Sequence, residues 1–170
     1  MLDLLRTRRS IRTFEDRPLE TKLVDALKEA VLRAPSSRGL NPWHFFFVTD
    51  PSLLATLAAC KPHGSAFLKN APLGVVVCAD PSICDVWVED ASIASLILHL
   101  TAHSLGLGSC WIQIRKRMHQ QETTAGDYIK EVLDLPDRLE VESIIAVGYP
   151  QNPPEGHPKE SLLWDRINER

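Results

Sequence analysis

The stretch from Trp87 to Leu105 limits the folds open to this chain more than any other segment. Placed on a helix, it carries apolar side chains almost all the way round, which is typical of a helix surrounded by other elements. Gly106 follows and can adopt the left-handed conformation that ends many helices. His99 and His103 interrupt the apolar run, so we exclude a membrane span. We therefore expect one long, central, buried helix, whose apolar positions include Val88, Ala91, Ile93, Ala94, Leu96, Ile97, Leu98 and Leu100.

Helix and strand patterns alternate along the rest of the chain. Leu19, Leu23, Leu27 and Val31 recur every four residues and predict a helix that ends at Ala34, because Pro35 disfavours the α conformation before it. Further helices are expected to start at Asp50-Pro51 and to span about residues 125–133. Strands are expected at residues 44–49, 73–79, 109–114 and 143–147. The stretch 73–79 is almost continuously apolar, so we expect both of its faces to be covered.

Size and composition are those of an ordinary soluble domain, and we expect residues 1–170 to form one domain. Nineteen Lys plus Arg against twenty-two Asp plus Glu give a net charge of −3, which argues against non-specific nucleic-acid binding. The four cysteines show neither a CxxC pair nor zinc-ligand spacing, so we predict reduced thiols and a cytoplasmic protein. His99 and His103 stand one helical turn apart, but no third ligand is positioned by the sequence, and we predict no metal site.

The C-terminal segment differs in character from the rest. Prolines cluster between Pro150 and Pro158, which leaves extended backbone without helix or sheet hydrogen bonds. The segment nevertheless ends in Leu162, Leu163 and Trp164, which are unfavourable in water. We therefore predict an extended arm over residues 149–170 that lies across a surface, most simply that of a second subunit.

Positive charge is concentrated near the amino end, where Arg6, Arg8, Arg9 and Arg12 fall within seven positions. If residues 8–12 are helical, three guanidiniums and the Ser10 hydroxyl converge, an arrangement that favours an anion such as phosphate or carboxylate. The alternative is an exposed basic turn that the nearby acidic residues 15 and 16 neutralise. Charge counting alone leaves both interpretations open.

The segment APSSRGLNPWHF, residues 34–45, supports a binding role. Ser36 and Ser37 offer two hydroxyls and free backbone amides in a loop that ends one helix and leads into a strand. A structural role for Trp43 in the core does not explain so many small donors at this place.

Five segments together resemble the nitroreductase family. They are RRSIRTF, APSSRGLNPWHF, GLGSCWI, IIAVGYP and HPKESLLW, and they occur in the family's order over nearly the whole chain. The resemblance implies an α+β fold with a mixed, mostly antiparallel sheet flanked by helices, a long central helix and a C-terminal arm exchanged in a homodimer. It also implies two FMN molecules bound at the dimer interface.

The resemblance further assigns cofactor-binding residues. Arg8, Arg9, Ser10 and Arg12 would face the FMN phosphate, and Lys159 of the arm would approach the same group. The phosphate would then be the anion that the arginine cluster requires.

The remaining assignments concern the flavin ring. Pro35, Ser36 and Ser37 would contact it from the partner subunit, and Ile112 and Gln113 would place backbone amides near its reactive edge.

Three positions depart from the family pattern, and the first is Gly39, which replaces the usual Asn. Asn41 replaces the usual Gln and is one methylene shorter, so its flavin contact is left open. Ser161 stands where larger relatives carry a second basic residue. Those relatives also have a helical insertion that helps to roof the substrate pocket, where this chain has only residues 80–90.

By this resemblance the chain is an FMN-dependent oxidoreductase that takes hydride from NADH or NADPH and reduces a small, flat acceptor such as a nitroaromatic or a quinone, with ping-pong kinetics. No catalytic side chain is expected, because the flavin supplies the chemistry. The alternatives are other flavin chemistry on the same fold (dehydrogenation, reductive dehalogenation or flavin breakdown), a non-catalytic flavin-binding protein, or a plain anion-binding module.

Overall fold

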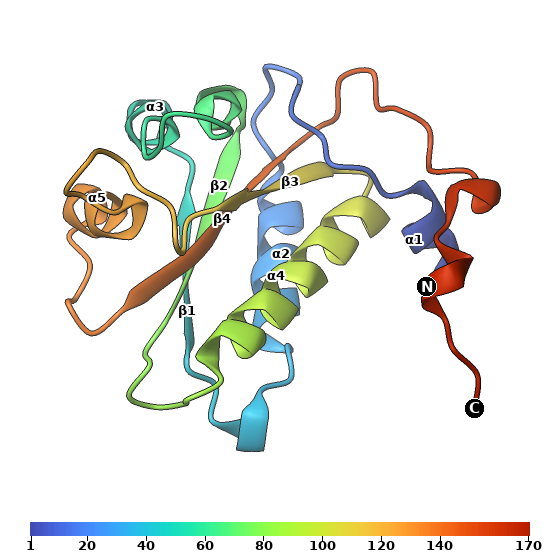
Figure 1. Cartoon of the computed structure of the whole chain (residues 1–170). Helices are drawn as coiled ribbons and strands as arrows, with labels where there is room; N and C mark the ends of the chain where they lie inside the picture. The colour runs from blue at the N-terminus through green and yellow to red at the C-terminus, as the bar shows by residue number, and fades with distance from the viewer.

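The computed structural model describes residues 1–170 as a four-stranded antiparallel sheet with helices on both faces (Figure 1). The strand order is β1-β2-β4-β3, so β1 and β3 form the two edges. Helices α2 and α4 cover one face and helices α3 and α5 cover the other. The strands are β1 (Trp43–Val48), β2 (Leu73–Ala79), β3 (Gly108–Gln113) and β4 (Glu140–Gly148). The helices are α1 (Leu2–Thr7), α2 (Thr21–Leu32), α3 (Pro51–Ala58), α4 (Trp87–Ser104) and α5 (Ala125–Leu133).

Most expected elements are confirmed. The Asp50 side chain accepts a hydrogen bond from the Leu53 amide and caps α3, and Gly106 has a φ of 76° after α4. The four strands pair antiparallel throughout, and the parallel pairing is limited to a single bridge between Ser10 and Ser109. β4 begins at Glu140, three residues earlier than expected, and this first part of the strand pairs with Cys78 and Ala79 beyond a register shift in β2.

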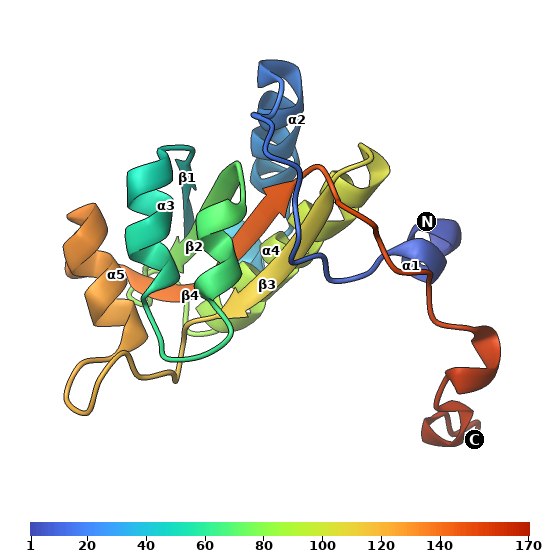
Figure 2. The ribbon, with the colours of Figure 1, turned by 90° about the horizontal axis from the view of Figure 1, so that it is seen from above.

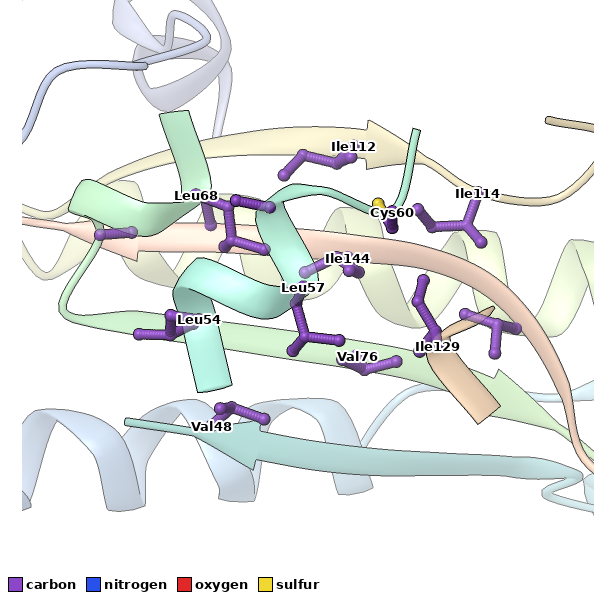
Figure 3. Packing of buried hydrophobic residues seen from close by; sticks show 14 of the residues in the cluster. Val48, Leu54, Leu57, Cys60, Leu68, Val76, Ile112, Ile114, Ile129 and Ile144 are labelled. Atoms are coloured by element: carbon purple, nitrogen blue, oxygen red, sulfur yellow. The ribbon is translucent and has the colours of Figure 1, made fainter. Parts of the chain in front are cut away.

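The core lies on both sides of the sheet. Every residue of β2 is buried, as its apolar sequence predicted. Figure 3 shows the packing on the α3 and α5 side, where Leu57 and Ile129 meet Val76 and Ile144. All four cysteines are buried and free. No helix has the length and apolar character that a bilayer span requires.

The long helix α4 is buried on one side only. Its sheet-facing residues, such as Ala94 and Leu98, are fully buried, whereas Ile93 and Leu96 are 40% and 51% exposed. The expectation of burial all round is therefore wrong for the single chain, because one sheet can cover only one side of a helix. The uncovered side is apolar.

The arm leaves the sheet after β4 and runs beside α1 (Figures 1 and 2). Its apolar residues Leu162, Leu163 and Trp164 are about half or more exposed.

The basic segment at the amino end is extended, not helical. Helix α1 ends at Thr7, and the backbone of Arg8 is already in the β region. The Ile11 amide donates to the Ser109 carbonyl at 3.0 Å, and the side chains of Ile11 and Phe14 are buried. The segment thus crosses the end of the sheet like an additional short strand (Figure 2).

Two glycines permit this close approach. A Cβ on Gly108 would lie 2.8 Å from the Ile11 Cβ, and one on Gly148 would lie 2.8 Å from the Phe14 ring. Neither distance is compatible with a real side chain, and both neighbours are buried in the core. Glycine at these two positions of β3 and β4 therefore allows the basic segment to dock.

We predict that Gly108→Ala destabilises the protein by about 1–3 kcal/mol, because the new methyl overpacks against the branched Ile11 side chain. Gly126→Ala is the matched control. It lies in the first turn of α5 with only a 3.7 Å contact, so alanine should stabilise by about 0.5–1 kcal/mol. Chemical denaturation measures both. Equal stability of Gly108→Ala and the wild type would contradict this packing.

Candidate functional site

The extended conformation decides where the arginines point. The segment buries Ile11 and Phe14 in one core cluster, and the side chains of Arg8, Ser10 and Arg12 stay outside that core. Burial raises the pKa of the Cys110 thiol, while Arg12, a hydrogen bond to Ser10 and Arg8 act against that rise. Ser10 pairs with Ser109 at the beginning of β3, and the Arg12 guanidinium lies nearby, 5.9 Å from the centre of the Phe67 ring.

Neither Arg8 nor Arg12 has a carboxylate within 4 Å, although acidic residues outnumber basic ones in the chain. The alternative interpretation, in which Glu15 and Asp16 neutralise this basic segment, is therefore not supported for Arg8 or Arg12. Glu15 lies 4.0 Å from Arg17 instead. Two unpaired guanidiniums and a hydroxyl near the beginning of β3 form a site suited to an anion.

Arg9 does not join this group. Its guanidinium donates to the carbonyl of Glu155 in the arm. The predicted convergence of all three arginines is therefore wrong, and the reason is the extended backbone. Arg9 fastens the arm to the basic segment.

A buried polar pair lies beneath the basic segment. His99 of α4 hydrogen-bonds through Nδ1 to the Ser109 hydroxyl at 2.7 Å, and its ring stacks on Trp111. Burial, with a further contribution from Arg8, lowers the pKa of His99 to about 4, so the imidazole is neutral at pH 7. His103 binds elsewhere, to the Thr7 hydroxyl at 2.7 Å. The structure holds no cluster of three or more His, Cys, Asp or Glu side chains arranged for a metal.

β3 is an edge strand, and its free edge offers backbone donors. The carbonyls of Ser109 and Gln113 point away from β4, since they accept from the Ile11 amide and the Lys61 ammonium. In an antiparallel strand the amide of a residue points to the same side as its carbonyl, so the Gln113 amide also faces the free edge. The amide of Ile112 points toward β4. Of the two amides predicted to lie near the flavin, only that of Gln113 therefore faces the free edge.

The Gln113 side chain has an internal role. It accepts from the Trp111 indole at 2.9 Å and donates to the Arg115 carbonyl at 3.0 Å. These bonds fix the turn after β3. Sequence reasoning missed Lys61, whose Nζ lies 2.9 Å from the Gln113 carbonyl; an exposed-looking lysine after a helix carries no signal for this position.

The loop after α2 is held in a strained conformation. Arg38 and Asn41 have positive φ values of 54° and 49°, a conformation that Asn adopts readily but that is unfavourable for Arg. The Ser36 hydroxyl contacts the Asn41 side chain at 2.7 Å, and the Ser37 amide donates to Asp90 at 2.8 Å. Asn41 is therefore engaged within its own loop.

Asp90, which sequence reasoning also missed, anchors this loop to the start of α4. It is 2% exposed, and its second oxygen accepts from the Cys84 thiol at 3.3 Å. The signal was present, since Asp90 is an acidic residue within an apolar helix. Around it lies an open hollow of about 410 Å³ that Pro35, Ser36 and Ser37 line together with Ile93.

The residues predicted to bind FMN do not form a single site within one chain. Asp90, beside the loop, and His99, beside Arg8, are nine residues apart on α4, which corresponds to about 14 Å along the helix. Lys159 lies on the exposed arm near Trp164. A larger hollow of about 830 Å³ is separate from both groups and lies between residues 13–21, the start of α3 and residues 69–72.

Comparison with known proteins identifies the family to which this chain belongs. The sequence pattern that defines the nitroreductase family matches residues 5–61 and 55–149. The chain belongs to the nitroreductase family, as the sequence resemblance indicated.

Particular relatives can be named. A protein from Methanothermobacter thermautotrophicus, provisionally named NADH dehydrogenase/NAD(P)H nitroreductase, is 35% identical over 91% of this chain and 79% of its own length. An FMN-dependent nitroreductase from Clostridium difficile R20291 is 43% identical and covers 99% of this chain and 98% of its own, with a TM-score of 0.98. A provisionally named nitroreductase in complex with FMN, from Desulfovibrio desulfuricans, is 25% identical over 99% and 95% of the two chains, with a TM-score of 0.79.

We predict that Asp90→Ala releases the loop, because the Ser37 amide loses its acceptor. Hydrogen exchange at this amide should accelerate about tenfold, in line with the cost of one unsatisfied buried donor. Asp90→Asn keeps an oxygen in place and should restore protection, and Cys84→Ala removes only the thiol contact. Unchanged exchange in Asp90→Ala would show that Asp90 does not hold the loop.

Proposed function

We propose that this protein is an FMN-dependent oxidoreductase that uses NADH or NADPH to reduce a flat, electron-poor acceptor. The observation that carries the proposal is the pair of unpaired guanidiniums, Arg8 and Arg12, near Ser10 at the beginning of edge strand β3. The names of the nitroreductase relatives support the same activity.

The donor set fits the phosphate of FMN. A phosphate close to a dianion takes charge-assisted hydrogen bonds from planar guanidiniums and from a hydroxyl. The neutral His99 below adds no competing charge. Lys159 of the arm would complete the set, whereas Arg9 would act indirectly through the Glu155 carbonyl.

Bound FMN would supply the hydride chemistry, accepting from the nicotinamide and delivering to the acceptor. The chain would hold and orient the ring along the free edge of β3. The Gln113 amide would donate there from a position fixed in advance, which favours negative charge on the ring edge. No side-chain acid or base is assigned, and a single open site used in turn by the two substrates implies ping-pong kinetics.

The test is the absorption spectrum. Purified protein, or protein mixed with FMN and desalted, should show bound-flavin bands in the visible. Anaerobic NADH or NADPH should bleach them within seconds, faster than it bleaches free FMN at the same concentration. A colourless protein that takes up no FMN, or bands that persist with both nucleotides, would refute the proposal.

We also propose a homodimer in which Pro35, Ser36 and Ser37 of one subunit face the flavin held by the other. One chain alone separates these residues from Arg8 by much of the length of α4. Ile93 and Leu96 on the outer side of α4 leave an apolar surface for the second subunit. The four buried free thiols support a reducing, cytoplasmic location.

Removing the arm tests the dimer. A chain that stops after Gln151 keeps the bridge of Pro150 to Phe14 and the bond from the Gln151 amide to Thr13, so the sheet should remain folded. It loses the exposed apolar residues of the arm, Leu162, Leu163, Trp164 and Ile167. Sedimentation equilibrium should give a monomer or a weakened dimer with reduced FMN content. A truncated chain with the full dimer mass and normal FMN content would contradict the exchanged arm.

A further inference from the structure

A second group of cations lacks carboxylate partners, at the opposite end of β3 from Arg8. Lys61, Arg115, Lys116 and Arg117 form no ion pair within 4 Å. Basic residues on the helices do pair, for example Arg33 with Glu29 at 2.7 Å. In a chain with an excess of acidic residues, unpaired charge gathered at one place needs a local explanation.

Lys61 is the best defined of the four. Its Nζ donates to the Gln113 carbonyl at 2.9 Å, on the free edge of β3, and the side chain is partly buried. Burial lowers the pKa of Lys61, and the nearby Arg117 lowers it further. An ammonium has three donors, and this bond uses one of them. Two adjacent cations, one partly withdrawn from water, are stabilised by an anion between them.

The turn after β3 holds Arg117 in place. The Arg117 amide donates to the Ile114 carbonyl at 2.9 Å, and its guanidinium donates to the Lys116 carbonyl at 3.3 Å. Arg115 instead lies over the Trp87 ring on the α4 side of the strand. His119 Nδ1 lies 3.0 Å from the Ala59 carbonyl, so the turn that carries Arg117 packs beside the segment that carries Lys61.

The FMN phosphate cannot bind at Arg8 and Arg12 and also contact Lys61. Gln113 follows Ser109 by four residues, so the carbonyl that Lys61 contacts lies about 14 Å along the strand from the Ser109 backbone, where the basic segment pairs with β3. The space between would hold the flavin ring, under the function proposed above. An anion bound at Lys61 would then belong to another molecule.

We propose that Lys61 and Arg117 form a subsite for a carboxylate or phosphate on the molecule that exchanges electrons with the flavin. The inference rests on the proposed oxidoreductase function and adds a substrate class to it. The anion has two possible sources, an anionic aromatic acceptor or the phosphates of NAD(P)H. In ping-pong kinetics the two half-reactions are measured separately, so the sources can be distinguished.

The test compares 4-nitrobenzoate with 4-nitrobenzamide, which have the same ring and differ in charge. The ratio of their kcat/KM values should fall about fivefold to tenfold in Lys61→Met and Arg117→Ala relative to the wild type, as expected for a lost hydrogen bond to a charged group in a partly exposed site. Comparing ratios cancels the different intrinsic reactivity of the two compounds. Lys61→Arg should retain most of the preference. Lys69→Met, an unpaired lysine beside the separate larger hollow, is the control.

A fall confined to kcat/KM for NADH or NADPH would assign the anion to the electron donor. Unchanged values for both half-reactions would overturn the subsite. The subsite would also be overturned if Lys61→Met lowered kcat/KM equally for both acceptors and lowered the flavin midpoint potential. Lys61 would then act on the flavin and not on the acceptor.

Calorimetric binding of 4-aminobenzoate and 4-aminobenzamide gives the same comparison without turnover. Preference for the carboxylate, lost in Lys61→Met, supports the subsite. Equal binding of both compounds to the wild type excludes an acceptor carboxylate. A wild type that oxidises no NADH would refute the proposed function, and the binding comparison would still judge the subsite.

Discussion

The close packing of an extended segment against two glycines is the constraint on which the rest of the site depends. Gly108 brings Ile11 onto β3, and Gly148 brings Phe14 onto β4. Once Ile11 and Phe14 are buried, Arg8, Ser10 and Arg12 are left outside the core, near Cys110 at the beginning of β3. A packing contact in the core thus sets the direction of the charges.

The fold was largely predictable because its elements carry strong local signals. The apolar run of β2, the Asp50 cap and the terminating Gly106 each act within a few residues, and each is found as expected. The outer side of α4 was not predicted correctly, because an apolar pattern does not specify which neighbour covers it. Ile93 and Leu96 need a surface that one chain does not contain.

The site was predictable in composition but not in geometry. Its basic residues were identified, yet a helical interpretation of residues 8–12 placed Arg9 with Arg8 and Arg12, and the extended backbone separates them. Ile112 and Gln113 are neighbours in sequence, but hydrogen bonding in the sheet turns their amides to opposite sides. Asp90 and Lys61 act through contacts with residues more than fifty positions away, which local patterns do not reveal.

A crystal structure of the protein with FMN tests the central claim most directly. The account predicts the phosphate beside Arg8, Ser10 and Arg12, over the Ser109 end of β3, with the segment still packed on Gly108. The flavin ring should extend along the free edge toward Gln113. A phosphate bound elsewhere, with Arg8 and Arg12 directed into solvent, would contradict it.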